Sequence, residues 1–422
     1  MTEEILDRAA RARDAAPPPG DERYLAYCDA LATRLDKRWD RVRAANDVDL
    51  ARAGGLPDAL ADRLRVGDAH REQLVALAGE VGRALPAATR PSEPLAATGR
   101  MRVRRIPKPL GVLLMIYEAR PTVTVEGALL PVAVGNVAIL RGGTEMAATN
   151  AALGAVVAEA AEAAGLPDGM VQVLTDGDRA LVRQLLRRHD AIDALVPRGS
   201  PALIEHCRTA STIPVIASGG GVNHLYVDAS ADLDLAARIA LDSKLAEPTA
   251  CNTLELVLAH ADVAEPLARR LVAAGIGLAR PYTLRLDAGL AGLVPGGPGA
   301  EVRVLGPHDD GREFLDRTLG LRAVAGLDEA VGHIRRHGSR HTEGVVATRP
   351  EVIDGFLRAV DAAALVVNGS LRLHDGPTMR LGPEISISTG RLHVRGPVGL
   401  TALLTYSWAI EGNATLRGEG AR

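Results

Sequence analysis

Two patterns of apolar residues divide the chain near residue 100. Before this point, apolar side chains recur every three or four residues, as over 58–64 and 70–78, and this spacing predicts amphipathic helices. Beyond it, the continuous apolar run at 111–116 and the alternating segment at 101–106 are typical of strands. We therefore expect a helical N-terminal part followed by a part that contains β-sheet.

Short apolar runs and stretches of helical spacing alternate along most of the remaining chain. This order predicts parallel sheets with crossover helices, in two successive α/β units. The segment 400–410 also has strand character and is expected to pair with 101–106. The further expected strands are 138–141, 171–174, 194–196, 224–228, 254–258, 344–348 and 363–367, and the expected helices are 150–164, 179–188, 233–244, 264–274, 328–337 and 350–360.

Composition supports a globular protein of two or three domains. The 422 residues are 47% hydrophobic and 24% charged. A net charge of −3 gives no electrostatic reason to expect nucleic acid or an anionic membrane as partner. The N-terminus has no apolar signal core and no uncharged apolar stretch reaches membrane-spanning length, so we expect a cytoplasmic protein.

Cys251 is the best candidate for a catalytic residue. It lies in the loop 248–253 directly before the predicted strand 254–258, where α/β enzymes place nucleophiles. A lone cysteine is more often a buried, inert side chain, and this is the expectation for Cys28 and Cys207. The three cysteines have no paired spacing, which argues against a disulfide framework and a zinc site, and we predict no metal ligands.

Several glycine-containing segments lie where predicted strands and helices meet. A helix that begins after glycine presents free N–H groups, which favour a phosphate, and the carboxyl edge of a parallel sheet is where dinucleotides bind. None of these segments has the Gly-x-Gly-x-x-Gly spacing, and each alone is more often a turn. Together with a thiol they indicate thioester or thiohemiacetal chemistry with hydride transfer. The predicted cofactor-binding residues are Arg141, Gly142, Gly143, Thr144, Arg198, Gly199, Ser200, Gly219 and Gly220.

A series of motifs resembles the gamma-glutamyl phosphate reductase family of the aldehyde dehydrogenase superfamily. The most specific are 117–121, 248–253, 395–399 and 405–408, and the resemblance runs from about residue 100 to 410. It implies an aldehyde dehydrogenase-like α/β fold. It also implies that NADPH, or alternatively NADH, reduces the acyl phosphate L-glutamyl 5-phosphate. The reaction would pass through a thioester on Cys251, and Asn252 is the second predicted catalytic residue.

The same resemblance implies a domain organisation and partners. It predicts a cofactor-binding domain at 1–99 and 113–226 and a catalytic domain at 227–385. It also predicts an oligomerisation hairpin at 100–112 and 400–412, and a return segment at 386–399. A homo-oligomer, either a dimer or a tetramer, is expected, and glutamate 5-kinase, which makes the acyl phosphate, is a candidate partner.

Two positions suit a reductase rather than a hydrolytic aldehyde dehydrogenase. Hydrolytic relatives carry a general-base glutamate before a Gly-Gly turn, whereas this chain has Ala217-Ser218 before Gly219-Gly220. Loss of that base excludes activated water from the thioester. The superfamily's oxyanion asparagine is replaced near Ala119. Backbone N–H groups near Cys251 are then the predicted oxyanion donors.

Three residues depart from the family pattern around the predicted site. Glu247 replaces an arginine close to Cys251, Arg380 replaces a glycine, and Thr144 replaces a lysine near the cofactor ribose. Arg380 either restores the positive charge lost at position 247 or faces solvent. Thr144 weakens the case for a cofactor 2′-phosphate.

Other candidate substrate contacts each have a structural alternative. Glu118 and Arg120 either orient the substrate or form a structural ion pair, and Lys244 either attracts phosphate or is solvated. His224 is expected to be a hydrogen-bonded structural residue.

Two other functions stay open at this point. The chain could reduce a different acyl phosphate or activated amino acid in secondary metabolism, because the departures cluster where substrate is expected to bind. It could also be a catalytically silent scaffold, which the retained Pro248, Cys251 and Asn252 argue against.

Overall fold

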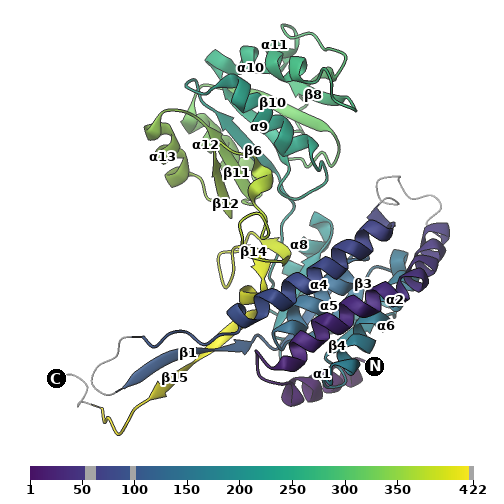
Figure 1. Cartoon of the computed structure of the whole chain (residues 1–422). Coiled ribbons are helices and arrows are strands. Elements are labelled where there is room, and N and C mark those ends of the chain that lie inside the picture. Colours follow the sequence, from purple (N-terminus) through teal and green to yellow (C-terminus); the bar gives the residue numbers. More distant parts are fainter. Residues whose placement is uncertain (53–62, 96–100, 418–422) are drawn as a thin grey trace. The chain divides into compact units, whose positions relative to one another are not determined.

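The computed structural model describes residues 1–52, 63–95 and 101–417, and Figure 1 shows the course of the chain. Residues 58–62 of the first expected helix and the expected domain boundary at 99–100 lie outside these ranges. Within the described ranges, no helix is both long and apolar enough to cross a membrane.

The chain divides into two compact units. Unit 1 comprises Met1–Ser218, Arg380–Ser386 and Pro397–Arg422, and unit 2 comprises Gly219–Met379 and Ile387–Gly396. The first division falls earlier than the expected one after residue 226, because the strand that starts at Asn223 pairs with strands of unit 2. The short strands β13 (Glu384–Ser388) and β14 (Gly396–Gly399), which carry the chain between the units, pair with each other.

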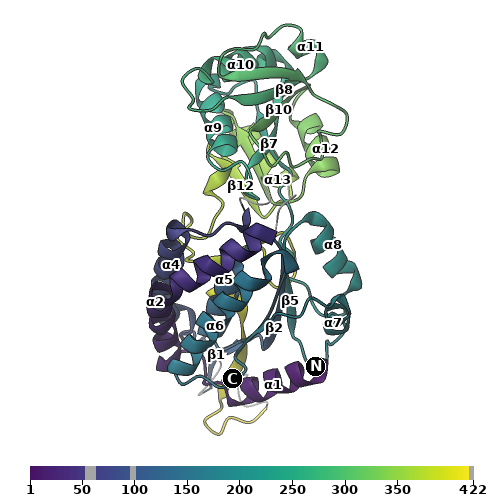
Figure 2. The same cartoon turned by 90° about the vertical axis from the view of Figure 1, so that its right-hand side faces the viewer.

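Unit 1 is built on a parallel sheet that has helices on both faces. Among the described residues the strand order is β4-β3-β2-β5, and every residue of β2 is buried. Figure 2 shows helices on both sides of this sheet, which explains why its strands are continuous apolar runs. The strands are β2 (Val112–Tyr117), β3 (Val137–Gly142), β4 (Val171–Leu174) and β5 (Ala194–Arg198), and the helices are α1 (Thr2–Ala15), α2 (Glu22–Arg52), α4 (Asp68–Ala88), α5 (Val123–Ala133), α6 (Ala147–Ala163), α7 (Arg179–Leu185) and α8 (Pro201–Ala210).

The register of this sheet brings three strand ends together. Tyr117 at the end of β2 pairs with Gly142 at the end of β3 and with Arg198 at the end of β5. The residues that follow these strands therefore meet at one carboxyl edge, as the sequence predicted.

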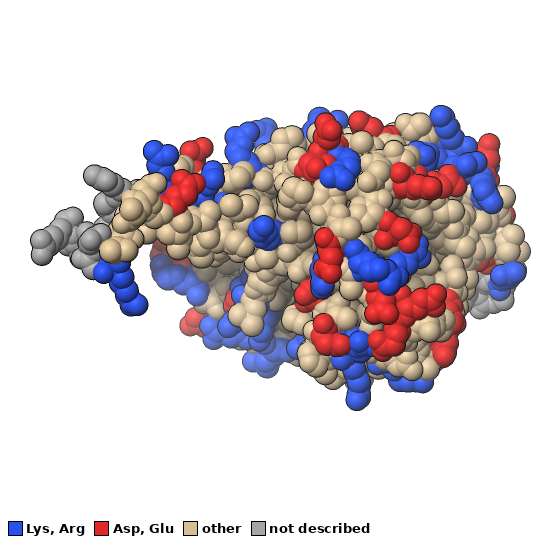
Figure 3. All heavy atoms as spheres, turned by 90° about the horizontal axis from the view of Figure 1, so that it is seen from below, with Lys and Arg blue, Asp and Glu red and all other residues tan. Residues whose placement is uncertain are grey.

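A two-stranded antiparallel ribbon extends from the sheet of unit 1. β1 (Arg102–Pro109) pairs with β15 (Leu404–Glu411), which confirms the predicted pairing of the C-terminal strand (Figure 1). Tyr406 and Trp408 on β15 are half-exposed and lie edge to face, with ring centroids 5.4 Å apart. On the face drawn in Figure 3, acidic and basic side chains are interspersed rather than gathered by sign.

Unit 2 contains a parallel sheet of seven strands, counted over the described residues. Successive residues of its strands point to opposite faces of the sheet, where two separate hydrophobic cores lie. Leu225 and Val227 pack in the core formed with α9 and α10, whereas Tyr226 packs in the core formed with α12 and α13. The strand order is β12 (Ala364–Val367), β11 (Thr342–Val346), β6 (Asn223–Val227), β7 (Leu254–His260), β10 (Thr318–Val324), β8 (Tyr282–Leu286) and β9 (Ala300–Val304), and the helices are α9 (Leu233–Leu245), α10 (Ala261–Ala274), α11 (Ala288–Ala291), α12 (Leu327–His337) and α13 (Pro350–Ala359).

Candidate active site

Cys251 lies in the turn between α9 and β7, at the amino edge of the sheet of unit 2. It is half-buried, whereas Cys28 and Cys207 are fully buried, and none of the three forms a disulfide. Burial raises the pKa of the Cys28 thiol to about 12 and that of Cys207 to about 11. These two thiols are therefore protonated and inaccessible, so Cys251 is the cysteine suited to nucleophilic chemistry.

Asn223 fixes the backbone on which Cys251 is carried. Its side-chain Nδ2 donates to the carbonyl oxygens of Cys251 at 2.8 Å and Thr253 at 2.7 Å, and lies 3.2 Å from that of Gly221. Its Oδ1 accepts the N–H of Thr342 at 3.1 Å. Asn223 is completely buried, so these bonds are shielded from water. The sequence prediction missed this residue, whose only signal was a polar side chain directly before a buried strand.

Gly221 lies directly against the carbonyl of Cys251. A Cβ atom on Gly221 would stand 1.5 Å from that oxygen, so no larger residue fits without moving the loop. The N–H of Gly221 donates to Glu313 Oε1 at 2.6 Å. The neighbouring Gly219 and Gly220 belong to the same unit as Cys251, and their predicted contact with the cofactor stays a prediction.

Asn252 links the turn that carries Cys251 to the segment that contains the 3₁₀ helix η2 (Leu371–Leu373). Its Nδ2 donates to the carbonyl of His374 at 3.0 Å, and its Oδ1 accepts from the guanidinium of Arg372. Asn252 is 2% exposed. Both ends of its side-chain amide are thus engaged within the protein, which makes its side chain a positioning group for the cysteine.

Arg372 also pairs with Glu247, the acid close to Cys251 in the chain. Its Nη2 lies 2.6 Å from a carboxylate oxygen of Glu247. Arg372, rather than Arg380, is therefore the cation paired with Glu247. Arg380 is exposed and has φ 58°, a conformation that favours glycine, and its predicted substrate contact stays a prediction.

Lys244 is buried in an ion pair with Glu255. Its Nζ lies 2.8 Å from Glu255 Oε2, and neither side chain is more than 3% exposed. The alternative that Lys244 is solvated is therefore wrong. Burial raises the pKa of Glu255 to about 7, against the opposing attraction of Lys244. The phosphate contact predicted for Lys244 stays a prediction, since its ammonium group is bound to Glu255.

The predicted cofactor residues of unit 1 gather at the carboxyl edge of its sheet. Gly142 ends β3, and Gly143 follows it. A Cβ atom on Gly142 would stand 2.0 Å from Asn150, and a Cβ atom on Gly143 would stand 2.1 Å from Glu145. Thr144 begins the 3₁₀ turn η1 (Thr144–Met146). Glycine is therefore needed at both positions to make room for the side chains of Asn150 and Glu145, and the contact of these glycines with a cofactor stays a prediction.

Two arginines at this edge have buried nitrogen atoms without protein partners. The Nε atoms of Arg141 and Arg198 form no hydrogen bond with any described residue. Arg141 otherwise donates only to backbone, to the carbonyls of Gly142 at 3.0 Å and Gly177 at 3.3 Å. Unpartnered guanidinium nitrogens at a glycine-lined edge fit the phosphates of a dinucleotide.

The N-terminus of α8 is already occupied by a carboxylate. Glu118 Oε1 accepts the N–H of Ser200 at 2.7 Å, and a Cβ on Gly199 would stand 2.7 Å from Glu118. Glu118 therefore holds the N-cap residue Ser200, whose own hydroxyl caps the helix by accepting the N–H of Leu203 at 3.3 Å. Both alternatives for Glu118, a substrate contact and an ion pair, stay predictions. Ala119, with φ 51°, donates its N–H to Glu145 at 2.7 Å. Arg120 is exposed beside them, and its substrate contact stays a prediction.

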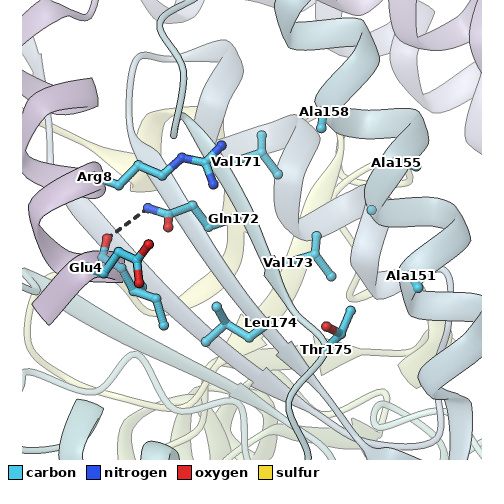
Figure 4. Close-up of a pocket in the computed structure, with 12 residues that line it drawn as sticks. Glu4, Arg8, Ala151, Ala155, Ala158, Val171, Gln172, Val173, Leu174 and Thr175 are labelled. Carbon is cyan, nitrogen blue, oxygen red and sulfur yellow. Dashed lines mark hydrogen bonds between the residues drawn. The ribbon is translucent and has the colours of Figure 1, made fainter. Parts of the chain in front are cut away.

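A pocket of about 470 Å³ beside β4 contains none of the predicted site residues. It is lined by α1, α6 and β4, and the side chain of Gln172 donates to the carbonyl of Ile5 at 3.1 Å across it (Figure 4). The walls contributed by α6 and β4 are mostly alanine and valine. Its polar lining residues are Glu4, Arg8, Gln172 and Thr175, and none of its lining residues is a cysteine, so this pocket is not the candidate site of thiol chemistry.

Comparison with known proteins gives one consistent family. Residues 65–278 match the model of the aldehyde dehydrogenase family. The chain is 43% identical to the gamma-glutamyl phosphate reductase of Sorangium cellulosum, over 98% of this chain and 97% of the relative. The crystal structure of gamma-glutamyl phosphate reductase from Thermotoga maritima superposes with a TM-score of 0.89 and 30% identity, covering 99% of both chains. An acetylating aldehyde dehydrogenase from Geobacillus thermoglucosidasius, at 17% identity and TM-score 0.71 over 97% of this chain and 96% of that one, shares the fold.

Proposed function

Because the chain belongs to the aldehyde dehydrogenase family and, within it, to the gamma-glutamyl phosphate reductases, we propose that it reduces L-glutamyl 5-phosphate to glutamate 5-semialdehyde and phosphate in proline biosynthesis. The observation that supports this most is the half-buried Cys251, held by Asn223 in a chain that follows these reductases from end to end.

The reaction begins with the sulfur of Cys251. The thiolate adds to the carbonyl carbon of the acyl phosphate, the C–O bond to phosphorus breaks, and phosphate leaves a thioester on Cys251. When bound, a reduced nicotinamide would supply the hydride that the thioester carbon takes up. The C–S bond then breaks, which releases the aldehyde and regenerates the thiolate. Backbone N–H groups of the turn 250–252 are the proposed donors to the oxyanion formed at each addition.

The unusual Glu247 does not argue for a different substrate. Its charge is paired with Arg372 at 2.6 Å, so a phosphate that approaches Cys251 meets a neutralised pair rather than a lone carboxylate. The physical reason for proposing another acyl phosphate is thereby weakened. We expect only a small effect of Glu247→Gln on the KM for the acyl phosphate, because the pair is partly exposed and screened.

The cofactor is a nicotinamide dinucleotide bound at the carboxyl edge of the unit 1 sheet. NADPH is the proposed form, and Arg141 is the proposed contact of its 2′-phosphate, because Thr144 leaves that turn without the family's lysine. Arg141→Ala should raise the KM for NADPH about tenfold while leaving that for NADH nearly unchanged. Equal effects on both cofactors would assign Arg141 to the shared pyrophosphate instead.

The test of the function is the reverse reaction. Purified protein is mixed with glutamate 5-semialdehyde, phosphate and NADP⁺ or NAD⁺, and the reduced cofactor is followed by absorbance. Formation that depends on phosphate supports the proposal, and formation only with another aldehyde contradicts the substrate. Cys251→Ser should abolish it. Cys207→Ser is the matched control, because Cys207 is buried and should leave turnover intact.

Two kinds of protein partner are predicted for an enzyme with this reaction. The glutamate 5-kinase that supplies the unstable acyl phosphate, and a dimer or tetramer of this chain, stay predictions. Co-purification with the kinase and light scattering test them independently of activity.

A further inference from the structure

Three side chains of unit 2 form a cluster that the proposed reaction does not use. Asp310, His333 and His337 each offer one ligand atom, and these atoms all lie within 4.8 Å of one another. His333 and His337 stand four residues apart on α12, so they share one face of its last turn. Asp310 comes from the loop between β9 and β10. The next residue, Gly311, lies beside His337, since a Cβ atom on Gly311 would stand 3.7 Å from His337 Nδ1.

His333 has a buried ring nitrogen without a partner among the described residues. It is 4% exposed, and its Nε2 forms no hydrogen bond with any described residue. Its ring lies edge-on to His224, with centroids 5.2 Å apart, and His224 Nδ1 is held 3.1 Å from the buried carboxylate of Glu343. A buried imidazole nitrogen without a partner is an unsatisfied group that a ligand would complete.

The carboxylate of Asp310 keeps one oxygen for such a ligand. Both hydrogen bonds from Arg322, at 3.1 and 2.7 Å, reach Oδ1, which leaves Oδ2. Arg322 also lies 3.3 Å from Asp287, so two carboxylates share one guanidinium. The carbonyl end of α12 favours a cation, whereas Arg335 and Arg336 in the same turn oppose it. Asp310 and Asp287 outweigh the one guanidinium that they share, so this group offsets part of the charge of a divalent ion.

We propose that Asp310, His333 and His337 bind a divalent transition metal ion of the Zn²⁺ class. Two imidazoles and one carboxylate are a ligand set that suits Zn²⁺, Co²⁺ or Ni²⁺, whereas Mg²⁺ and Ca²⁺ prefer oxygen alone. Histidines at i and i+4 on a helix recur as metal ligands. Metal–ligand bonds of about 2.0–2.2 Å require the three ligand atoms, which lie within 4.8 Å of one another, to approach to roughly 3.3 Å from each other. The half-buried Asp310 and His337 can do this by side-chain rotation, and the fourth position is left for water.

Cysteine spacing does not predict this site, because its ligands are two histidines and an aspartate. Asp310 lies 23 residues before His333 in the chain (333 − 310), which is not a recognised ligand spacing. The fold makes the site by placing the β9–β10 loop beside the end of α12.

The test uses the full chain stripped of metal with a chelator, in a Cys251→Ser background so that the catalytic thiol cannot bind the ion. Co²⁺ is titrated and its visible absorption recorded, then Zn²⁺ is added in competition. We expect one equivalent of Co²⁺ with the d–d bands of nitrogen and oxygen ligands and no thiolate charge-transfer band. Zn²⁺ should displace it. These readouts do not depend on enzyme activity, so they succeed or fail separately from the proposed function.

His337→Ala and Asp310→Asn should each weaken Co²⁺ and Zn²⁺ binding by on the order of 100-fold. Both positions are half-buried, so these variants should fold, which circular dichroism checks. His308→Ala is the matched control, since His308 is an exposed histidine of the same loop and should leave the affinity unchanged. Zn²⁺ should also raise the unfolding midpoint of the parent and of His308→Ala but not of the other two variants. Binding that is absent from the parent, or unaffected by His337→Ala and Asp310→Asn, would overturn the proposal.

Discussion

The side chain of Asn223 should decide whether Cys251 is held ready for reaction. Asn223→Ala removes two short hydrogen bonds to the carbonyls of Cys251 and Thr253 and one from the N–H of Thr342. Because Asn223 is completely buried, water cannot replace these bonds without entering the core. The change therefore removes one hydrogen bond from each of three backbone groups, at Cys251, Thr253 and Thr342.

The expected cost follows from these three groups. A lost hydrogen bond that leaves a buried partner unsatisfied costs about 1–3 kcal/mol, although relaxation of the loop recovers part of it. We expect Asn223→Ala to lower the free energy of unfolding by about 3 kcal/mol. Asn223→Asp should cost at least as much: it keeps the acceptor for Thr342 but sets a carboxylate against two carbonyl oxygens.

Urea unfolding measures the stability, and the rate of alkylation by iodoacetamide measures the geometry and exposure of Cys251. Cys28 and Cys207 are buried and should react only on unfolding, so they report global opening within the same sample. Both variants should lose turnover more than the stability loss explains, with an altered alkylation rate at Cys251. If Asn223→Ala kept parental turnover and an unchanged alkylation rate, the assignment of Asn223 as the group that positions Cys251 would be refuted.

Four further changes test other parts of the structure. Gly221→Ala should cost on the order of 3 kcal/mol and most of the activity, because its Cβ would meet the Cys251 carbonyl at 1.5 Å; Gly289→Ala, with open space around it, should change the unfolding free energy by less than about 1 kcal/mol. Lys244→Met should cost about 3–5 kcal/mol in urea unfolding by leaving Glu255 buried and unpaired, and adding Glu255→Leu should recover part of that loss. Arg380→Gly should raise the unfolding free energy by about 1 kcal/mol, because φ 58° is strained for arginine, and no gain would contradict the backbone conformation. For Asp228, burial would raise the pKa, but hydrogen bonds from Ser230, Arg349 and Tyr226 outweigh it and hold the pKa at about 2. Its stabilisation of about 2 kcal/mol is therefore present above pH about 4 and lost as pH falls through about 2, a loss that Asp228→Asn should not show in urea unfolding at several pH values.

The sequence predicted the elements that have a strong local pattern. The strands β2 to β5 of unit 1 and the helices α6 and α7 lie close to their expected ranges, because most of these strands are apolar runs bounded by glycine or polar residues. The three strands β8, β9 and β10 were missed. β8 alternates in burial and β9 is largely exposed, so neither forms a continuous apolar run. α5 was missed for the opposite reason, since ten of its eleven residues are buried and no polar face marks its period.

The candidate site was predictable only where chemistry and chain order coincide. Cys251 and the carboxyl edge of unit 1 could be proposed from the sequence because a strand and the loop directly before or after it are local features. Asn223 is 28 residues from Cys251 in the chain, and Arg372 is 125 from Glu247, so only the fold shows that they meet.

The pairing of Glu247 with Arg372 shows how a substitution acquires its meaning from its neighbours. Considered alone, a carboxylate close to the nucleophile should repel an acyl phosphate and raise the thiol pKa. In the structure the same carboxylate accepts from a guanidinium that also bonds Asn252, the residue next to Cys251. Glu247 thereby becomes one end of a short chain of contacts that orders the catalytic turn. Removal of Arg372 should then impair the enzyme more than removal of Glu247, since it both frees the acid and releases Asn252.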